Sequence, residues 1–265
     1  MRRLAALRAL LAALFVVLLG GCSTLVPAPV AQPSTPQAAL DAWARVLDRF
    51  VDERGEVDFA ALARDRADLD RYVRHVADSP LEQWPDGPPR LAHMINAYNA
   101  LSMFNVIQSG IPATHAGLNK LTFFLLRKLD IGGRPMSLYS FENDVIRPYA
   151  RGEPRIHFAL NCSALSCPAL PRVPFGASTL DAELERETRA FFARRENFRV
   201  DLATSTVWLS ELLDFYPADF VPVAADSLLA YANRYAPQPA PPGFTLRFTQ
   251  YDWTIANSRR PGRAP

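Results

Sequence analysis

Hydrophobic residues recur at intervals of three or four through the first half of the chain. Leu40, Trp43 and Leu47 illustrate the spacing, which places one apolar face on an amphipathic helix. Asp58 stands before the second such segment and can cap its first turn. Gly110 follows the third segment and ends it. The pattern therefore predicts helices over about 38–52, 58–78 and 90–109.

Strand signals gather in the second half. Gly132 and Gly133 separate the segments 128–131 and 134–138 and predict a tight hairpin. A second hairpin is predicted at 198–210, and further strands at 156–161 and 244–251. Helices are predicted to start at Ser137 or Ser140 (ending before Pro148) and at Ser178 or Thr179, while the type of 121–126 stays open. The expected fold class is α+β, with a helical N-terminal half packed on a small, mainly antiparallel sheet.

The first residues have the pattern of an export signal. Arg2, Arg3 and Arg8 precede an uncharged apolar run at 9–21, which is too short to span a bilayer as a helix. The run ends in Leu-Gly-Gly before Cys22, which resembles the lipobox of bacterial lipoproteins. This resemblance implies that residues 1–21 are removed and that Cys22 carries lipid, with palmitate as an expected acyl group. Ser23 in the next position favours the outer membrane over the inner one.

Charge and composition limit the functional classes and the domain organisation that the chain can have. Removing 1–21 removes three arginines and no acid, so the formal charge falls from +2 to −1. A nearly neutral chain lacks the basic surface that nucleic-acid binding requires. Four prolines at 27–36 predict an extended tether. The expected organisation is a signal peptide at 1–21, a lipidated cysteine and tether at 22–37, one globular domain at 38–256 and a disordered tail at 257–265. The partners expected from this pattern are a membrane, through the lipid on Cys22, and a peptide or envelope polymer as substrate.

Two asparagines mark the third predicted helix as unusual. Asn96 and Asn99 lie three residues apart within an otherwise apolar segment, so both amides are expected to be buried. A buried amide needs hydrogen-bond partners. One interpretation is a structural network that holds neighbouring loops. The other is that an amide orients a catalytic side chain or stabilises an oxyanion.

The segment 141–147 contains a second set of candidate residues, two charged side chains beside apolar ones. Glu142 and Arg147 flank Val145 and Ile146. They form either a surface ion pair or cap, or the charged wall of a cleft.

The densest candidate chemistry lies at 155–168. In the predicted strand, His157 shares a face with Asn161, and Cys162 and Cys167 follow at once. A histidine base can activate a thiol that is otherwise mostly protonated at neutral pH. Cys162 is the preferred nucleophile, because it lies closer to the strand end, whereas Cys167 precedes a proline.

Two other interpretations of the cysteines stay open. An oxidising compartment could pair Cys162 with Cys167 as a structural disulfide. Alternatively, His157 and both cysteines could hold zinc, although a fourth ligand at suitable spacing is missing. No cofactor or metal is therefore expected.

These motifs, taken in order, resemble the domain of unknown function 547 family. The segments that carry the resemblance are 95–100, 137–147, 155–160, Cys162 with 166–168, and 251–253. The resemblance implies no settled activity. It marks a set of candidate positions: Asn96, Tyr98, Asn99, Glu142, Arg147, Arg155, His157, Cys162 and Cys167.

The residue chemistry suggests a papain-like or transglutaminase-like site. Cys162 or Cys167 is the candidate nucleophile, His157 the base, and Glu142 or Asn99 the orienting group. Asn96, Tyr98, Arg147 and Arg155 are candidate substrate-binding residues. Both cysteines follow the histidine, which requires a permuted order. The expected function is a cysteine-dependent hydrolase or acyl transferase acting on an amide bond. The alternative is a non-catalytic envelope binding or scaffold lipoprotein with a structural Cys162–Cys167 pair.

Overall fold

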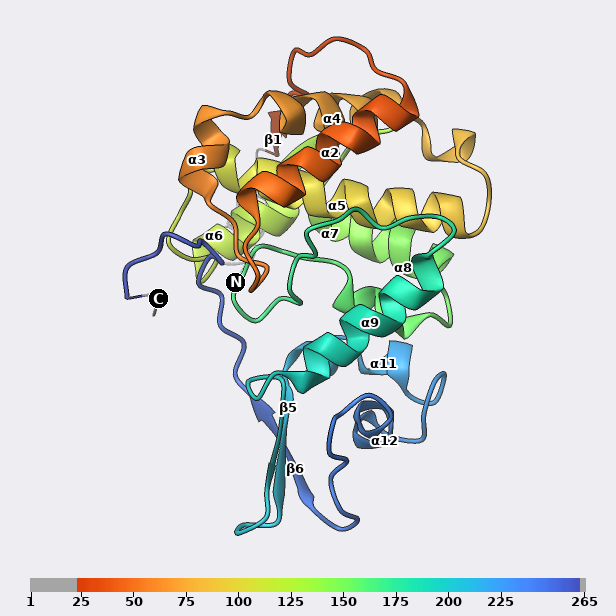
Figure 1. The fold of residues 1–265 in the computed structure, drawn as a ribbon, viewed down its shortest axis with the longest axis vertical. Coiled ribbons are helices and arrows are strands. Elements are labelled where there is room, and N and C mark those ends of the chain that lie inside the picture. The colour runs from red at the N-terminus through yellow and green to blue at the C-terminus, as the bar shows by residue number, and fades with distance from the viewer. Residues whose placement is uncertain (1–22, 263–265) are drawn as a thin grey trace, which may run out of the picture.

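A layer of helices covers one end of the molecule and a small β-ribbon forms the other (Figure 1). The computed structural model describes residues 23–262, so the predicted signal peptide and Cys22 lie outside the described residues. The helices are α2 (Pro36–Phe50), α3 (Phe59–Arg64), α4 (Ala67–Asp78), α5 (Pro88–Gln108), α6 (Leu118–Leu121), α7 (Leu138–Ser140), α8 (Arg147–Tyr149), α9 (Leu180–Ala193), α10 (Leu212–Phe215), α11 (Pro217–Phe220) and α12 (Leu228–Asn233). Leu81–Gln83 and Pro154–Phe158 are 3-10 turns, and Thr122–Leu126 and Phe141–Ile146 are π-helical turns.

The strands form two sheets of three. The first sheet joins β1 (Thr24–Val26), β2 (Arg127–Ile131) and β3 (Arg134–Met136), and the second joins β4 (Phe198–Asp201), β5 (Thr206–Ser210) and β6 (Thr245–Thr249). The α+β class and both hairpins are confirmed. Each sheet contains one antiparallel and one parallel pair, so the β structure is mixed and divided rather than one mainly antiparallel sheet.

Helix α5 is the centre of the N-terminal half. Every residue from 91 to 106 is buried, which explains why its sequence is apolar on all sides. Helices α2 and α4 pack together beside it, and Trp43 stacks on Tyr72 with ring centroids 5.5 Å apart. A second core, rich in aromatic residues, lies between α9, α12 and the second sheet. Phe124 packs against both cores and so marks their junction.

Two predicted elements are wrong in their secondary structure. The segment predicted as a strand at 156–161 begins as the turn Pro154–Phe158 and continues as a loop. Pro154 occupies its first turn, and Glu153 accepts a hydrogen bond from the backbone N–H of Arg155. The predicted second helix is divided into α3 and α4, because the backbone leaves the helical conformation at Asp65.

The helix predicted to end before Pro148 instead runs on to Tyr149. The π-helical turn lets the Arg147 N–H bond to the Glu142 carbonyl, five residues back. This wider turn accommodates Pro148, which has no N–H to donate.

Both ends of the described chain pack on the domain more than predicted. Thr24–Val26, expected to be tether, pairs in parallel with β2. At the other end, Arg259 bonds to Asp58 at 2.8 Å and Arg260 pairs with Glu56. Between residues 23 and 262 we find no helix that is both long and apolar enough to cross a membrane.

A buried imidazole in the first core predicts an acid-sensitive fold. His93 stacks on Trp84 with centroids 4.0 Å apart, and burial, with a smaller contribution from His75, lowers its pKa to about 3. The unfolded chain binds this proton near pH 6.5 and the folded chain does not, so stability falls as pH drops below 6.5. We expect wild type to lose about 2 kcal/mol more than His93→Phe between pH 7.5 and 5, measured by urea unfolding. His75 is present in both proteins, so its contribution to the pH dependence cancels in the comparison. Equal losses of unfolding free energy in the two proteins would contradict a neutral, buried His93.

Candidate functional site

Five of the residues selected from the sequence line one small cavity between the two cores. Tyr98, Glu142, His157, Cys162 and Cys167 come from three separate segments and surround a volume of about 50 Å³. The rest of the wall is mostly aromatic: Phe124, Leu160, Pro168, Leu212, Phe215, Tyr216, Tyr251 and Trp253. The structure therefore brings together most of the predicted chemistry.

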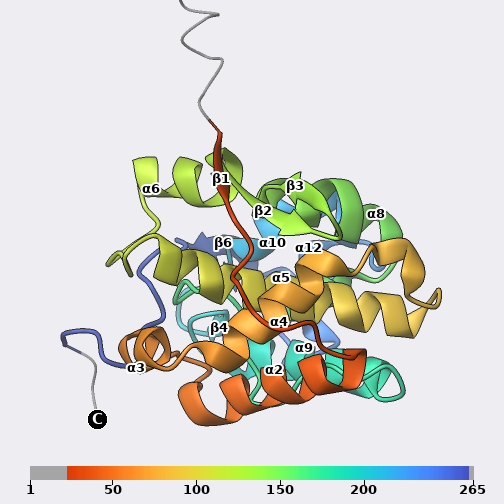
Figure 2. The same ribbon diagram turned by 90° about the horizontal axis from the view of Figure 1, so that it is seen from above.

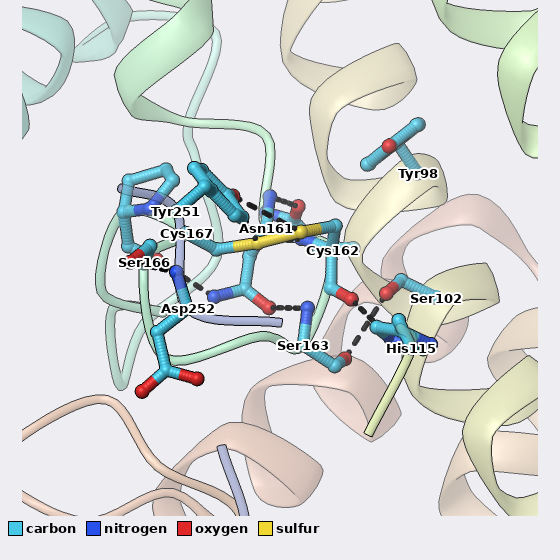
Figure 3. Close-up of a disulfide and its surroundings, with 12 residues drawn as sticks. Tyr98, Ser102, His115, Asn161, Cys162, Ser163, Ser166, Cys167, Tyr251 and Asp252 are labelled. Carbon is cyan, nitrogen blue, oxygen red and sulfur yellow. Dashed lines mark hydrogen bonds between the residues drawn. A yellow bond between two sulfur atoms is a disulfide. The ribbon is translucent and has the colours of Figure 1, made fainter. Parts of the chain in front are cut away.

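The two cysteines are joined by a disulfide (Figure 3). Both residues are buried, with Cys162 8% and Cys167 4% exposed. The Cys162 N–H and the Tyr251 hydroxyl each reach Cys167 Sγ at 3.1 Å, whereas Cys162 Sγ is 3.4 Å from the same hydroxyl. Burial and then the charge of Glu142 raise the pKa of Tyr251, so this phenol stays protonated and can donate.

A network of asparagine hydrogen bonds holds the backbone that carries the cysteines. Asn99 donates to the Ala159 carbonyl at 3.0 Å and accepts from the Asn161 N–H at 2.7 Å. Asn161 in turn accepts from the Ser163 N–H at 2.8 Å and donates to the Pro168 carbonyl at 2.7 Å. Both the nitrogen and the oxygen of the Asn99 amide thus bond to backbone groups. These are the contacts of a structural network that positions the loop.

His157 is held by a carboxylate that the sequence did not reveal. Its Nε2 is 2.7 Å from Asp219 Oδ2, and its ring stacks on Tyr216 with centroids 4.4 Å apart. Arg147 donates two hydrogen bonds to the same carboxylate, at 2.7 and 2.9 Å. Burial acts to raise the pKa of Asp219, but the bonds from His157 and Arg147 outweigh it and hold that pKa well below its ordinary value. Asp219 therefore stays ionised and can orient the imidazole and stabilise its charged form.

Glu142 lies among phenol groups. Tyr98 donates its hydroxyl to Glu142 Oε2 at 2.8 Å. Burial, the charge of Glu142 and a hydrogen bond to it raise the pKa of Tyr216. Burial and the charge of Glu142 likewise raise the pKa of Tyr98 well above its usual range. In the cavity, the side chain of Glu142 therefore accepts hydrogen bonds from the neutral hydroxyl groups of tyrosines.

Three other predicted residues point to different partners. Asn96 bonds to both backbone groups of Phe175 and to the indole of Trp43. Arg155 pairs with Glu153 and Asp181 at 2.6 and 2.7 Å, and these contacts raise its pKa. Arg147 bonds to Asp219, and its guanidinium lies over the ring of Tyr216, 4.7 Å from the centroid. None of the three lines the cavity.

A larger cleft lies on the outer side of Cys167. It has a volume of about 510 Å³ and includes Asn161, Ser166 and Pro168 from the same loop. Charged residues of both signs complete it: Glu53, Arg54, Glu56, Arg194, Glu196, Asp252 and Arg260. Cys167 lines both this cleft and the inner cavity, whereas Cys162 lines the inner cavity and is not among the residues of the cleft. Contact with both hollows and two hydrogen-bond donors at its sulfur therefore favour Cys167, the reverse of the preference drawn from the sequence.

Sequence reasoning missed Asp219, Tyr216 and Tyr251 as site residues. Tyr251 belonged to a motif that was noticed, and its place in that motif was the available signal. Asp219 lies 62 residues from His157 and carries no local pattern that connects the two.

The sulfurs are bonded to each other, so in this state they are not available as the zinc ligands considered above. Across residues 23–262 we find no cluster of three or more histidine, cysteine, aspartate or glutamate side chains arranged to hold a metal ion.

Loss of the disulfide is expected to destabilise the fold moderately. The bond closes a loop over a sequence separation of five, for which the chain-entropy effect is about 2 kcal/mol. A Cys162→Ala/Cys167→Ala variant should lose about that much free energy of unfolding in urea, and added reductant should not change it further. Reductant should lower the stability of wild type similarly. An unchanged wild type under reductant would show that the bond contributes nothing.

Comparison with known proteins adds one finding. Residues 81–192 match the model of a family described as "Protein of unknown function, DUF547". The matched segment contains α5, Glu142, His157 and both cysteines, which confirms the resemblance over this part of the chain. Asp219 and Tyr251 lie beyond it, so the resemblance up to residue 253 stays a prediction. No curated protein and no solved structure matches the chain.

Proposed function

We propose that this protein is a lipid-anchored envelope protein whose cavity at Cys167 and His157 is a thiol-dependent active site. The reaction is hydrolysis or acyl transfer at an amide bond. The disulfide is the resting form. A dithiol protein exchanges with it, which leaves two thiols on this chain and a disulfide on the donor.

The observation that carries the proposal is the position of Cys167. It lines both the cavity that contains His157 and Glu142 and the open cleft of about 510 Å³. A nucleophile in such a position can meet a substrate on one side and its base on the other. The two donors at 3.1 Å would also stabilise a Cys167 thiolate after reduction.

The chemistry follows from these groups. The Cys167 thiol gives its proton to His157 through Nδ1, because Nε2 is engaged by Asp219. The thiolate attacks the amide carbonyl, a C–S bond forms, and the C–N bond breaks as the imidazolium protonates the leaving amine. Water or a second amine then attacks the thioester and releases the thiol.

The cleft suggests the class of substrate. Arg54, Arg194 and Arg260 stand with acidic residues around it, so it suits a peptide that carries charges of both signs. An envelope peptide fits this description. The lipobox-like sequence before Cys22 supports placement at the envelope, facing the periplasm, with the outer membrane favoured by Ser23.

Acylation of the reduced protein tests the proposal. p-Nitrophenyl acetate should release one p-nitrophenolate per reduced chain, and the acetyl group should map to Cys167. The oxidised protein and a Cys167→Ser variant should release none in this burst, whereas Cys162→Ser should retain it. Acylation of the native reduced protein no faster than that of a urea-unfolded control would contradict an activated thiol.

A second candidate is a non-catalytic binding or scaffold protein with a structural disulfide. The observations that favour it are the burial of both cysteine residues and the hydrogen bonds by which Asn96 and Asn99 hold neighbouring loops. Under this candidate, reduction lowers stability and gives no rapid acylation. The same experiment therefore distinguishes the two.

A further inference from the structure

Three leucines form an exposed stripe on one helical segment. Leu118, Leu121 and Leu125 lie on α6 and the turn Thr122–Leu126, spaced by three and four residues so that they share one face. They are 80%, 43% and 39% exposed. Single exposed apolar residues are common, but a contiguous apolar face on a helix marks a surface that contacts another apolar phase.

The stripe lies beside the N-terminal end of the described chain. The turn Thr122–Leu126 leads directly into β2, and β2 pairs with β1. Leu25 of β1 is 55% exposed and lies opposite Lys128 in the register. Figure 2 shows α6 next to β1 on the side where the chain enters the fold. We call Leu25, Leu118, Leu121 and Leu125 the leucine patch.

Positive charge accompanies the patch. Arg127 and Lys128 follow Leu125 after one intervening residue, Leu126, and are half-buried on β2. Apolar side chains with adjacent basic groups are the composition that favours the interface of an anionic bilayer. A protein partner could use the apolar face, but the nearby chain entry favours lipid, because only Ser23 separates Cys22 from β1.

We infer that the leucine patch lies in the bilayer interface and fixes the orientation of the domain on the membrane. This inference rests on the proposed lipid at Cys22. Because β1 starts two residues after Cys22, the lipid would hold the domain against the surface rather than at the end of a tether.

The orientation bears on the proposed active site. Residues 53–56 line the cleft and precede α3, and Figure 2 shows α3 at the opposite side of the domain from β1. With the leucine patch on the bilayer, the cleft opens away from it. A substrate would then reach Cys167 from the aqueous side, which suits a soluble peptide or polymer.

Spin labelling of the full lipidated chain on anionic vesicles tests the surface. A Leu118→Cys variant offers one free thiol, because Cys162 and Cys167 are bonded and Cys22 would carry lipid. The matched control is Leu202→Cys, which is 73% exposed and directly follows β4, outside the leucine patch. On vesicle binding, the collision rate of the label at 118 with a water-soluble nickel chelate should fall several-fold, while that at 202 should not change.

The outcomes separate this inference from the proposed anchor. A chain that sediments with vesicles and carries lipid on its N-terminal peptide, but leaves the label at 118 as accessible as that at 202, overturns the leucine patch as a membrane surface and leaves the anchor standing. A chain that lacks the lipid and stays in the supernatant overturns both. Neither outcome depends on acylation of Cys167, so the proposed chemistry is tested separately.

Discussion

Replacing Asp219 with asparagine is expected to slow acylation of the reduced protein by about 10²–10⁴-fold. Asp219 accepts from His157 Nε2 at 2.7 Å, and its charge stabilises the imidazolium that forms when Cys167 loses its proton. Asparagine keeps the shape of the side chain but removes that charge. The rate is measured from the p-nitrophenolate burst, with urea unfolding to confirm that the variant is folded.

Two controls separate this effect from general damage. Asp214→Asn changes an exposed acid on α10, the neighbouring helix, and should leave the rate unchanged. Arg147→Met removes the other partner of Asp219 and keeps the histidine contact, so a smaller loss is expected. An Asp219→Asn rate equal to wild type would show that the His157–Asp219 pair does not act on the thiol.

Replacing Asn99 with leucine is expected to lower the free energy of unfolding by about 3 kcal/mol. The substitution retains volume inside α5 but leaves two buried backbone groups, the Ala159 carbonyl and the Asn161 N–H, without their partner. Each such group costs about 1–3 kcal/mol. Urea unfolding of the oxidised protein measures the loss.

Asn119 provides the matched control. Its amide also donates to a backbone carbonyl, that of Thr114, but at an exposed position. Asn119→Ala should therefore change stability by no more than about 0.5 kcal/mol. Similar losses in the two variants would mean that the Asn99 network does not hold the cysteine loop as described.

Helices α2 and α4 could be predicted because each has one apolar and one polar face. In α2, Leu40, Trp43 and Leu47 recur at the spacing that the structure confirms. The segment with His157 could not be predicted in the same way. All residues from 156 to 164 are buried between the two cores. The alternation of polar and apolar residues in this segment therefore does not mark one face that points to solvent. Without such a face, a period of two does not distinguish a strand from a buried turn and loop.

The candidate site was predictable only where its residues lie in distinctive local patterns. Glu142, His157 and the cysteines stood out by type and neighbourhood. Asp219 is an ordinary acid in a short helix, and only the tertiary fold carries it to His157. The strand β1 was missed for a related reason, because its partner lies about a hundred residues further along the chain.

The most direct test of a thiol-dependent site is the pH dependence of iodoacetamide labelling, with the labelled residue mapped by mass. Before reduction, neither Cys162 nor Cys167 should be labelled. After reduction, we predict that Cys167 is labelled rapidly well below pH 8, that Cys162 is labelled much more slowly, and that Tyr251→Phe shifts the Cys167 profile to higher pH because a donor to the thiolate is lost. Equal labelling of both cysteines with the profile of an ordinary thiol, unaffected by Tyr251→Phe, would contradict an activated nucleophile and leave a structural disulfide.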